Sequence, residues 1–579
     1  MPRSPASGLL LLSLFSATCA FAGPASTQTT GWAGYERVQA VRSQAEALSK
    51  KDAPEADLRQ ATAKLEDMLV YLDTPEMREL SRGNTSLHFR GHDVRADLAA
   101  LYCRLNMHEQ AIAALQAAQQ FSWTPGFIQG YGLDKDCASL SADPRFQRII
   151  KTAELPNRLW QSLGQDVPYR PKLTVAERIA GLTTFWTEAR QNFVYFDQVP
   201  DLDWNKVYME YLPKVIAAET TRDYYRVMMQ LAPLLKDGHT NIYPPNELAN
   251  QFYARPPVKT VLVEDKVIVE KVNDADLAQR LHVGDEIVAI DGIPVQRYAE
   301  QHIAPFVSSS TPQDRTLRMF TYQLLMGEAK TPVKLTLRDQ RGRQREEALA
   351  RSGYKPAKSP APFAFRMLPD GVAYFALDHF ESDAGVKAFE RALPEIMNAK
   401  VLIIDVRGNG GGSTEFGHAV LRYLSPEEPR GAISYVRQDE ALPRAQGQTF
   451  VRWNPVPELP VGSRQVKTPI FSGKVAVLQG PRTFSAGEDF LVAYNAMKRG
   501  ITVGEATGGS TGQPLMLALP GGGQARICIK RDVQPDGTQF VGLGIAPSVI
   551  ESQTVASIRA GRDPVLERAI AELRAGPGS

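Results

Sequence analysis

Hydrophobic side chains recur at helical spacing through the N-terminal part of the chain. Between residues 36 and 154, apolar positions repeat every three or four residues, and the alternation typical of half-buried strands is missing. The clearest stretch, residues 93–118, predicts two helices joined by a turn at residues 106–108. We therefore expect a helical domain over residues 30–155.

A second helical stretch covers residues 175–235 and is rich in aromatic side chains, which are usually core residues. It ends in a turn at Asp237, and a strand is predicted to start at residues 240–243. His239 thus lies on a turn between two elements. We expect residues 174–250 to form the helical start of a larger region.

Short strands and tight turns follow. The pattern predicts a small β module over residues 255–340, with a hairpin turn at Asp291 and a last strand at residues 333–337.

From residue 360 onward, strand and helix signals alternate. Residues 371–377 and 401–406 read as buried strands, with a helix over residues 383–397 between them. This predicts an α/β domain with a parallel or mixed sheet over residues 360–575. A glycine-rich turn and the turn at Ser485 each follow a strand, so we expect both at the carboxyl edge of the sheet, where ligands collect.

Ser485 lies between a predicted strand, residues 474–478, and a predicted helix, residues 488–497. A serine at a helix N-terminus is most often a cap, and Glu488 three residues later would complete a capping box. The same place suits a nucleophile, because free backbone N–H groups and the helix dipole stabilise developing negative charge. The pattern alone leaves both interpretations open.

Gly408 and residues 410–412 make up the glycine-rich turn. A phosphate-binding loop is excluded, because no Lys-Ser or Lys-Thr pair follows. A dinucleotide-binding turn is disfavoured, since the acidic residues about 20 positions later, Glu427 and Glu428, lie in a loop. An oxyanion hole, which needs only backbone donors near a nucleophile, and a plain structural turn remain.

Composition excludes some function classes. The 579 residues carry a formal net charge of +2, which gives no basic footprint for nucleic acid. Cysteine and histidine spacing matches no metal-ligand motif, so we expect no metal and no cofactor. Cys103 and Cys137 lie in one short region, and we hypothesise that they form a disulfide after export.

Residues 1–22 have the pattern of a secretory signal peptide. They combine a basic start, an apolar run over residues 9–15 that is too short to span a bilayer, and an Ala-Phe-Ala cleavage site. No later apolar stretch is long enough for a membrane helix. We expect a soluble protein without a transmembrane anchor, periplasmic or secreted after cleavage near Ala22.

Five motifs, in this order, resemble the C-terminal-processing (tail-specific) serine peptidases over roughly residues 174–573. They are D-G-H-T at 237–240, V-G-D-E-I-V-A-I-D-G at 283–292, L-I-I-D-V-R-G-N-G-G-G at 402–412, T-F-S-A-G-E at 483–488 and G-E-A-T-G-G-S at 504–510. The resemblance implies a PDZ domain, which captures a peptide C-terminus, and a ClpP/crotonase-like core. Separately, the N-terminal helical hairpin is similar to a tetratricopeptide unit.

The resemblance also implies residue roles. Ser485 maps to the nucleophile, and the oxyanion hole maps to the N–H groups of Gly411, with Gly410 as fallback, and Ala486. One branch of the family uses a lysine base where this chain has Ser510, so a lysine dyad is disfavoured.

The other branch, which includes the tricorn core proteases, carries the histidine of D-G-H-T, so His239 is the expected base. The chain departs from that branch near its end, because Val541 stands where relatives carry a glutamate and Ser548 replaces the usual aspartate. The candidates left for the acid that orients His239 are Asp237, Glu505 and Asp532.

The sequence thus predicts an exported serine endopeptidase that hydrolyses polypeptides through an acyl-enzyme. The alternative is a weak or inactive peptidase-fold protein that binds peptides or a lipophilic ligand, because loss of an orienting acid costs orders of magnitude in rate. The helical domain is expected to serve as a scaffold for oligomers or other partners.

Overall fold

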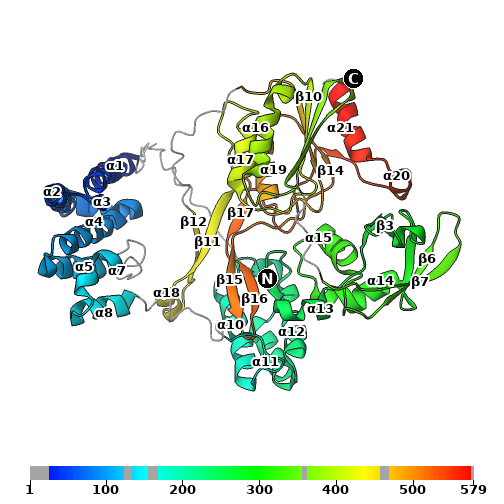
Figure 1. Ribbon diagram of the computed structural model, residues 1–579, viewed down its shortest axis with the longest axis horizontal. Helices are drawn as coiled ribbons and strands as arrows, with labels where there is room; N and C mark the ends of the chain where they lie inside the picture. Colours follow the sequence, from blue (N-terminus) through cyan, green and yellow to red (C-terminus); the bar gives the residue numbers. More distant parts are fainter. Residues whose placement is uncertain (1–24, 123–132, 154–166, 355–360, 457–468, 576–579) are drawn as a thin grey trace, which may run out of the picture. The chain divides into compact units, whose positions relative to one another are not determined.

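The computed structural model describes residues 25–122, 133–153, 167–354, 361–456 and 469–575. The chain divides into two compact units, Met1–Gln161 and Ser162–Ser579 (Figure 1). The predicted signal peptide lies outside the described residues.

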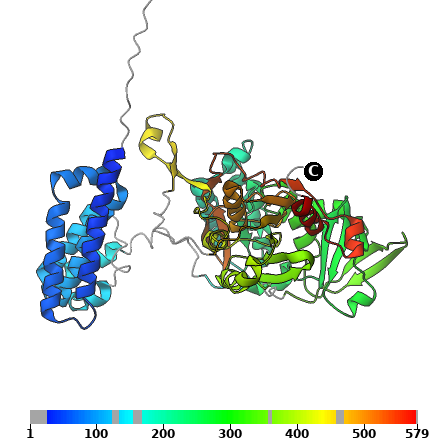
Figure 2. The ribbon, with the colours of Figure 1, turned by 90° about the horizontal axis from the view of Figure 1, so that it is seen from above.

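The first unit is helical, as predicted. Figure 2 shows its long helices side by side. The described α-helices of this unit are α1 (Ala25–Leu48), α2 (Glu55–Leu72), α3 (Pro75–Gly83), α4 (Thr85–Arg104), α5 (His108–Ser122), α7 (Leu133–Asp136) and α8 (Pro144–Ala153). The turn between α4 and α5 contains Asn106, which has a φ of 56°. Asparagine tolerates this left-handed conformation well. A disulfide joins Cys103 of α4 to Cys137, which confirms the hypothesised pairing.

The second unit begins with α10 (Val175–Asn192), α11 (Trp204–Ala217) and α12 (Thr221–Met228). A capping box of Thr174 and Glu177 starts α10. The predicted strand after the His239 turn is β1 (Asn241–Tyr243), and it pairs antiparallel with β16 (Gly523–Cys528), the partner of β15 (Pro514–Leu519). This pairing fixes the His239 turn against the C-terminal part of the chain.

An antiparallel sheet forms the β module, with strand order β2-β3-β4-β6-β7 and β5 beside β4. Its strands are β2 (Val258–Val263), β3 (Lys266–Val272), β4 (Glu286–Ile290), β5 (Ile293–Pro294), β6 (Val333–Arg338) and β7 (Gln344–Leu349). The prediction that residues 333–337 end the module is wrong, because β7 continues it beyond residue 340. Gly342, with a φ of 81°, makes the turn into β7 and is the signal that the sequence offered.

The α/β domain is built on a mixed sheet with the order β18-β14-β13-β10-β9-β8. Its neighbouring strands pair in parallel except β8, which is antiparallel to β9. The strands are β8 (Phe363–Leu368), β9 (Val372–Leu377), β10 (Val401–Asp405), β13 (Lys474–Gln479), β14 (Ile501–Gly504) and β18 (Val549–Ile550).

Both faces of this sheet are covered, which explains why its central strands are apolar throughout. Alternate residues such as Leu402 and Ile404 pack in one core with α16 (Ala384–Met397), α17 (Thr414–Leu421) and α19 (Ala486–Met497). The intervening residues, such as Ile403, pack with α21 (Pro564–Ala575) on the other face (Figure 1).

The remaining described segments flank these layers. A second small sheet consists of β11 (Ile433–Asp439), β12 (Val451–Pro455) and β17 (Arg531–Val533). In the described ranges, no helix combines the length and the apolar character that crossing a membrane requires.

Candidate active site

Ser485 follows β13 through a tight turn and directly precedes α19. Its φ of 56° and ψ of −127° are rare for a residue with a side chain, and such a backbone costs about 1–3 kcal/mol. Two backbone hydrogen bonds hold the turn: Ser485 N–H donates to Ser510 O at 3.0 Å, and Phe484 N–H donates to Asn409 O at 2.9 Å. The strained turn is thus joined to the glycine-rich turn after β10.

The capping-box interpretation of Ser485 is wrong. The Ser485 side chain makes no capping hydrogen bond. The fully buried Glu488 carboxylate instead accepts from Thr507 Oγ1, from Gly509 N–H at 2.8 Å and from Ser510 N–H at 2.8 Å. Glu488 therefore fixes the turn at residues 507–510.

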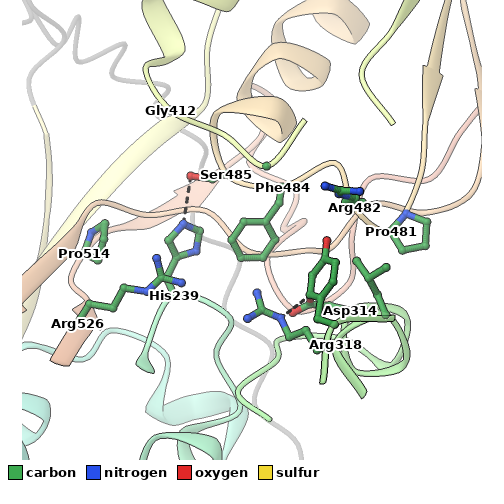
Figure 3. A pocket seen from close by; sticks show the side chains of 13 residues that line it. His239, Asp314, Arg318, Gly412, Pro481, Arg482, Phe484, Ser485, Pro514 and Arg526 are labelled. Atoms are coloured by element: carbon green, nitrogen blue, oxygen red, sulfur yellow. Dashed lines mark hydrogen bonds and ion pairs between the residues drawn. The ribbon is translucent and has the colours of Figure 1, made fainter. Parts of the chain in front are cut away.

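His239 reaches Ser485 from the turn before β1. Its Nε2 lies 3.1 Å from Ser485 Oγ, and its ring stacks on Phe484 with centroids 4.6 Å apart and planes 13° apart (Figure 3). The imidazole is only 4% exposed. Residues that are 246 positions apart in the sequence are thereby held at hydrogen-bond distance.

Ser510 is the second partner of the imidazole. His239 Nδ1 lies 2.7 Å from Ser510 Oγ, and Ser510 Oγ–H donates to Asp237 Oδ1 at 3.4 Å. With the proton on Nδ1, the ring donates to Ser510 and leaves Nε2 free to accept from Ser485. Sequence reasoning placed Ser510 only as the replacement of a lysine, and did not assign it to the histidine.

The three candidate acids differ in their surroundings. Asp237 is fully buried and also accepts from Thr240 Oγ1 at 2.7 Å and Ser310 Oγ at 3.3 Å. Burial raises its pKa, while the Thr240 hydrogen bond and Arg526 oppose the rise. Its link to His239 runs through Ser510.

The other two acids have partners elsewhere. Asp532 lies in β17, where it pairs with Lys530 at 3.1 Å and accepts from Ser434. Glu505 lines a separate cavity, and burial raises its pKa. In the described ranges, neither hydrogen bonds with His239.

The two positions that depart from the family pattern are structural here. Val541 is 3% exposed and packs in the core, and its carbonyl accepts from Gln198 at 3.3 Å. Ser548 Oγ–H donates to Thr502 O at 2.9 Å and so joins the chain before β18 to β14.

The electrostatic environment keeps His239 neutral. Burial lowers its pKa well below the ordinary value of 6.5, and the cations of Arg526, Arg318 and Lys530 lower it further. A neutral imidazole can accept a proton at neutral pH. Forming the imidazolium in this place is costly, because no carboxylate touches the ring directly in the described part of the chain.

The glycine-rich turn packs against the serine. A Cβ on Gly411, whose φ is 108°, would lie 2.7 Å from Ser485 Cβ, so only glycine fits there. Gly411 N–H donates to Asn409 Oδ1 at 2.9 Å and is therefore engaged. Among the described residues, the N–H groups of Gly410 and Ala486 take no partner.

A cavity of about 360 Å³ opens beside Ser485 and His239. Gly410, Gly412 and Phe484 line the cavity together with three arginines. Figure 3 shows Gly412 and Phe484 next to Ser485. No group of histidine, cysteine and acidic side chains in the described ranges is arranged to hold a metal ion.

Parts of the chain are similar to known peptidases. Residues 371–550 match the model of peptidase family S41, and residues 175–232 match that of the tricorn protease C1 domain. A chloroplastic C-terminal processing peptidase of Tetradesmus obliquus is 25% identical over 279 residues, which are 46% of this chain and 52% of the relative. The match thus spans about half the length of that curated relative.

Solved structures agree on the fold. Mature CPAF superposes with a TM-score of 0.56 at 15% identity and covers 70% of this chain and 99% of its own. Its complex with lactacystin gives a TM-score of 0.55 at 14% identity, with 69% and 98% covered. The predicted family resemblance, the helical N-terminal region and the mixed-sheet core are confirmed.

Proposed function

We propose that this chain, which carries a peptidase family S41 domain over residues 371–550, is a serine-type endopeptidase that hydrolyses polypeptides through an acyl-enzyme. The observation that carries the proposal is the 3.1 Å approach of His239 Nε2 to Ser485 Oγ at a strained turn beside a cavity. A nucleophile within reach of a neutral base is the geometry that acyl transfer needs.

In this mechanism Ser485 Oγ attacks the peptide carbonyl carbon while its proton passes to His239 Nε2. The C–N bond then breaks, and His239 gives the proton to the leaving amine. Water, deprotonated by the same nitrogen, hydrolyses the ester and returns the serine. Ser510 accepts from Nδ1–H throughout and keeps the ring in the productive tautomer.

Backbone donors stabilise the oxyanion. Gly410 and Ala486 are the preferred pair, because no described residue accepts from their N–H groups and Gly410 lines the cavity. Gly411 could donate only after its N–H leaves Asn409 Oδ1.

Hydrolysis of casein and of labelled peptides tests the proposal. We expect Ser485→Ala and His239→Ala each to lose at least about 10³-fold in kcat, because a nucleophile and its base act as a unit. Equal turnover by both variants and the parent protein would contradict the assignment. Ser548→Ala, at an exposed serine outside the site, is the matched control.

A second candidate function is a binding protein for peptides or a lipophilic ligand. It is favoured by the neutral hydroxyl of Ser510 behind the imidazole, where a carboxylate would support catalysis. It predicts unchanged ligand affinity in Ser485→Ala and no reaction with a serine-directed phosphonate. Stoichiometric labelling of Ser485 would exclude it.

The other modules have proposed roles of their own. The sheet of residues 258–349 is proposed to act as a PDZ domain that binds a peptide C-terminus, and the helical unit as a tetratricopeptide-like scaffold for oligomers or partners.

Export of the protein is a further proposal, and it rests on residues 1–22. N-terminal sequencing of protein from cell fractions tests it, and a periplasmic or secreted product starting near residue 23 is expected.

A further inference from the structure

The cavity beside Ser485 is lined by more cations than anions. Its charged side chains other than His239 are Arg318, Arg482, Arg526 and a single acid, Asp314. We call these three arginines the arginine pocket. Figure 3 shows Arg526 on the His239 side and the other two arginines beyond Phe484.

Arg318 is already paired. Its Nε donates to Asp314 Oδ1 at 2.7 Å, and its guanidinium lies 5.2 Å from the Phe484 ring centre. Burial raises the pKa of Asp314, while Arg318 opposes the rise. The pair leaves no net charge at this side of the cavity, and it fixes Arg318 against the ring that stacks on His239.

Arg526 and Arg482 have no ion-pair partner in the described ranges. Arg526 donates to two neutral acceptors, Asn241 Oδ1 at 2.8 Å and Gly238 O at 3.3 Å. Arg482 lies 5.8 Å from the Tyr322 ring centre. The arginine pocket therefore contains two arginines without a salt bridge among the described residues, although the buried Asp237 lies close enough to Arg526 for that cation to lower its pKa.

Acids in the adjoining cavity reduce the excess at Arg482. That cavity is lined by five acids (Glu264, Glu270, Asp378, Asp405 and Glu505) and, besides Arg482, by the cations Lys259 and Arg407. Burial raises the pKa of Asp378, and Arg482 lowers it. Arg482 lines both cavities, so its positive charge acts on the adjoining cavity as well as on the cavity at Ser485. Arg526 lines only the cavity at Ser485, and it is one of the cations that lower the pKa of His239.

A peptide carboxylate is the complement of such a pocket. Guanidinium groups bind carboxylates through charge-assisted, often bidentate hydrogen bonds, which are stronger in a partly buried site than in water. We propose that the arginine pocket selects substrates with an aspartate or glutamate side chain next to the bond placed at Ser485. This inference rests on the proposed function and names its substrate class.

The same carboxylate would assist the chemistry. Among the described residues, no carboxylate touches the imidazole of His239, and nearby cations disfavour its protonated form. A substrate carboxylate in the arginine pocket offsets that field when the imidazolium forms. Acidic substrates should therefore have a higher kcat as well as a lower KM.

Binding to the Ser485→Ala protein tests the selection without requiring turnover. The probes are N-terminally labelled alanine-serine peptides with Glu or Gln at one position at a time, each with a free or an amidated C-terminus. At one position we expect about tenfold tighter binding for Glu than for Gln, with either terminus. Equal affinity at every position, or a preference set only by the free C-terminus, would overturn the inference.

Variants assign the effect to the arginines. Arg482→Gln and Arg526→Gln should each reduce the Glu-over-Gln ratio to about threefold or less. Arg482→Lys, which keeps the charge but loses the planar two-donor geometry, should give a ratio between those of the parent and of Arg482→Gln. Arg568→Gln, on the exposed face of α21, makes the same charge change and should leave the ratio intact. A ratio that is unchanged in both pocket variants would contradict the assignment.

Two further measurements separate the possible failures. In the Ser485→Ala protein with all three arginines present, raising salt from about 50 mM to about 500 mM should weaken binding of the Glu peptide more than binding of the Gln peptide. Equal weakening of the two peptides would count against the inference. Hydrolysis of peptides without acidic residues reports on the proposed function alone. If these peptides are hydrolysed and no preference for Glu is found, the inference about the arginine pocket is wrong while the proposed peptidase function still holds.

Discussion

Ser510 takes the place behind the histidine that an acid holds in a Ser-His-Asp triad. Its hydroxyl accepts from His239 Nδ1–H and passes a hydrogen bond to Asp237. Because the second contact is 3.4 Å long, the carboxylate stabilises the imidazolium only weakly. Ser510 is therefore a positioning residue, and the relay fixes the tautomer more than it supplies charge.

Removing the Ser510 hydroxyl tests this positioning role. We expect Ser510→Ala to lower kcat about 10- to 100-fold with little change in KM, since the ring loses the partner that orients it. Ser510→Thr, which keeps a hydroxyl, should recover part of the loss. A Ser510→Ala protein with parental kcat would show that the hydroxyl is dispensable.

The pH profile tests the environment of His239. Burial and nearby arginines lower its pKa well below 6.5, so the base stays deprotonated to lower pH than a free histidine. We expect the acidic limb of kcat/KM for an uncharged peptide to have its midpoint below pH 6.5. The unfolded chain binds more protons below that value, so His239 also lowers stability as pH falls through this window. An acidic limb above pH 6.5 would be inconsistent with a buried neutral base.

At the scale of elements, the first turn of α19 organises the site. The Glu488 side chain does not complete a capping box. It accepts hydrogen bonds from the turn that carries Ser510. Burial raises its pKa to about 8, and the hydrogen bonds with Thr507, Ser510 and Gly509 oppose the rise. The helix that follows Ser485 thus also positions Ser510, the partner of His239.

An amide at this position should break the arrangement. Above about pH 8, where the Glu488 carboxyl is ionised, both of its oxygens accept hydrogen bonds. In Glu488→Gln at that pH, an NH₂ group would instead face a backbone N–H of Gly509 or Ser510, and a buried unpaired donor costs about 1–3 kcal/mol. We expect a free energy of unfolding lower by that amount and a kcat reduced about tenfold or more, measured by denaturant titration and peptide hydrolysis. Parental values for both would contradict the role given to Glu488.

The elements themselves were largely predictable. Strands β9, β10 and β13 and helix α16 match their predicted ranges, because continuous apolar runs and helical spacing are local signals. The capping box failed, since the competing partners of Glu488 lie about 20 residues later in sequence. The pairing of Ser510 with His239 joins residues 271 positions apart and depends on β1 meeting β16, which no local pattern encodes.

At the scale of the whole molecule, the chain separates its proposed chemistry from its helical unit. Ser485, His239 and Ser510 all lie within Ser162–Ser579. The disulfide lies within Met1–Gln161. Each unit has its own core, so loss of one is not expected to unfold the other.

Removing the disulfide tests this independence. Cys103 and Cys137 are 34 positions apart, and closing a loop of that length stabilises by about 3–4 kcal/mol in the chain-entropy model. The Cys103→Ser/Cys137→Ser protein should show a lower first unfolding transition in calorimetry, with unchanged hydrolysis of short peptides. Loss of peptide hydrolysis in proportion to the unfolding of the helical unit would contradict the separation.

The central claim is that Ser485 is a nucleophile activated by His239. The most direct measurement is the rate of covalent labelling by a peptidyl phosphonate, with the adduct mapped by mass spectrometry in the parent protein and in His239→Ala. We expect one adduct per chain, on Ser485, forming at least about 10²-fold more slowly in His239→Ala. An adduct elsewhere, or equal labelling rates in both proteins, would contradict it.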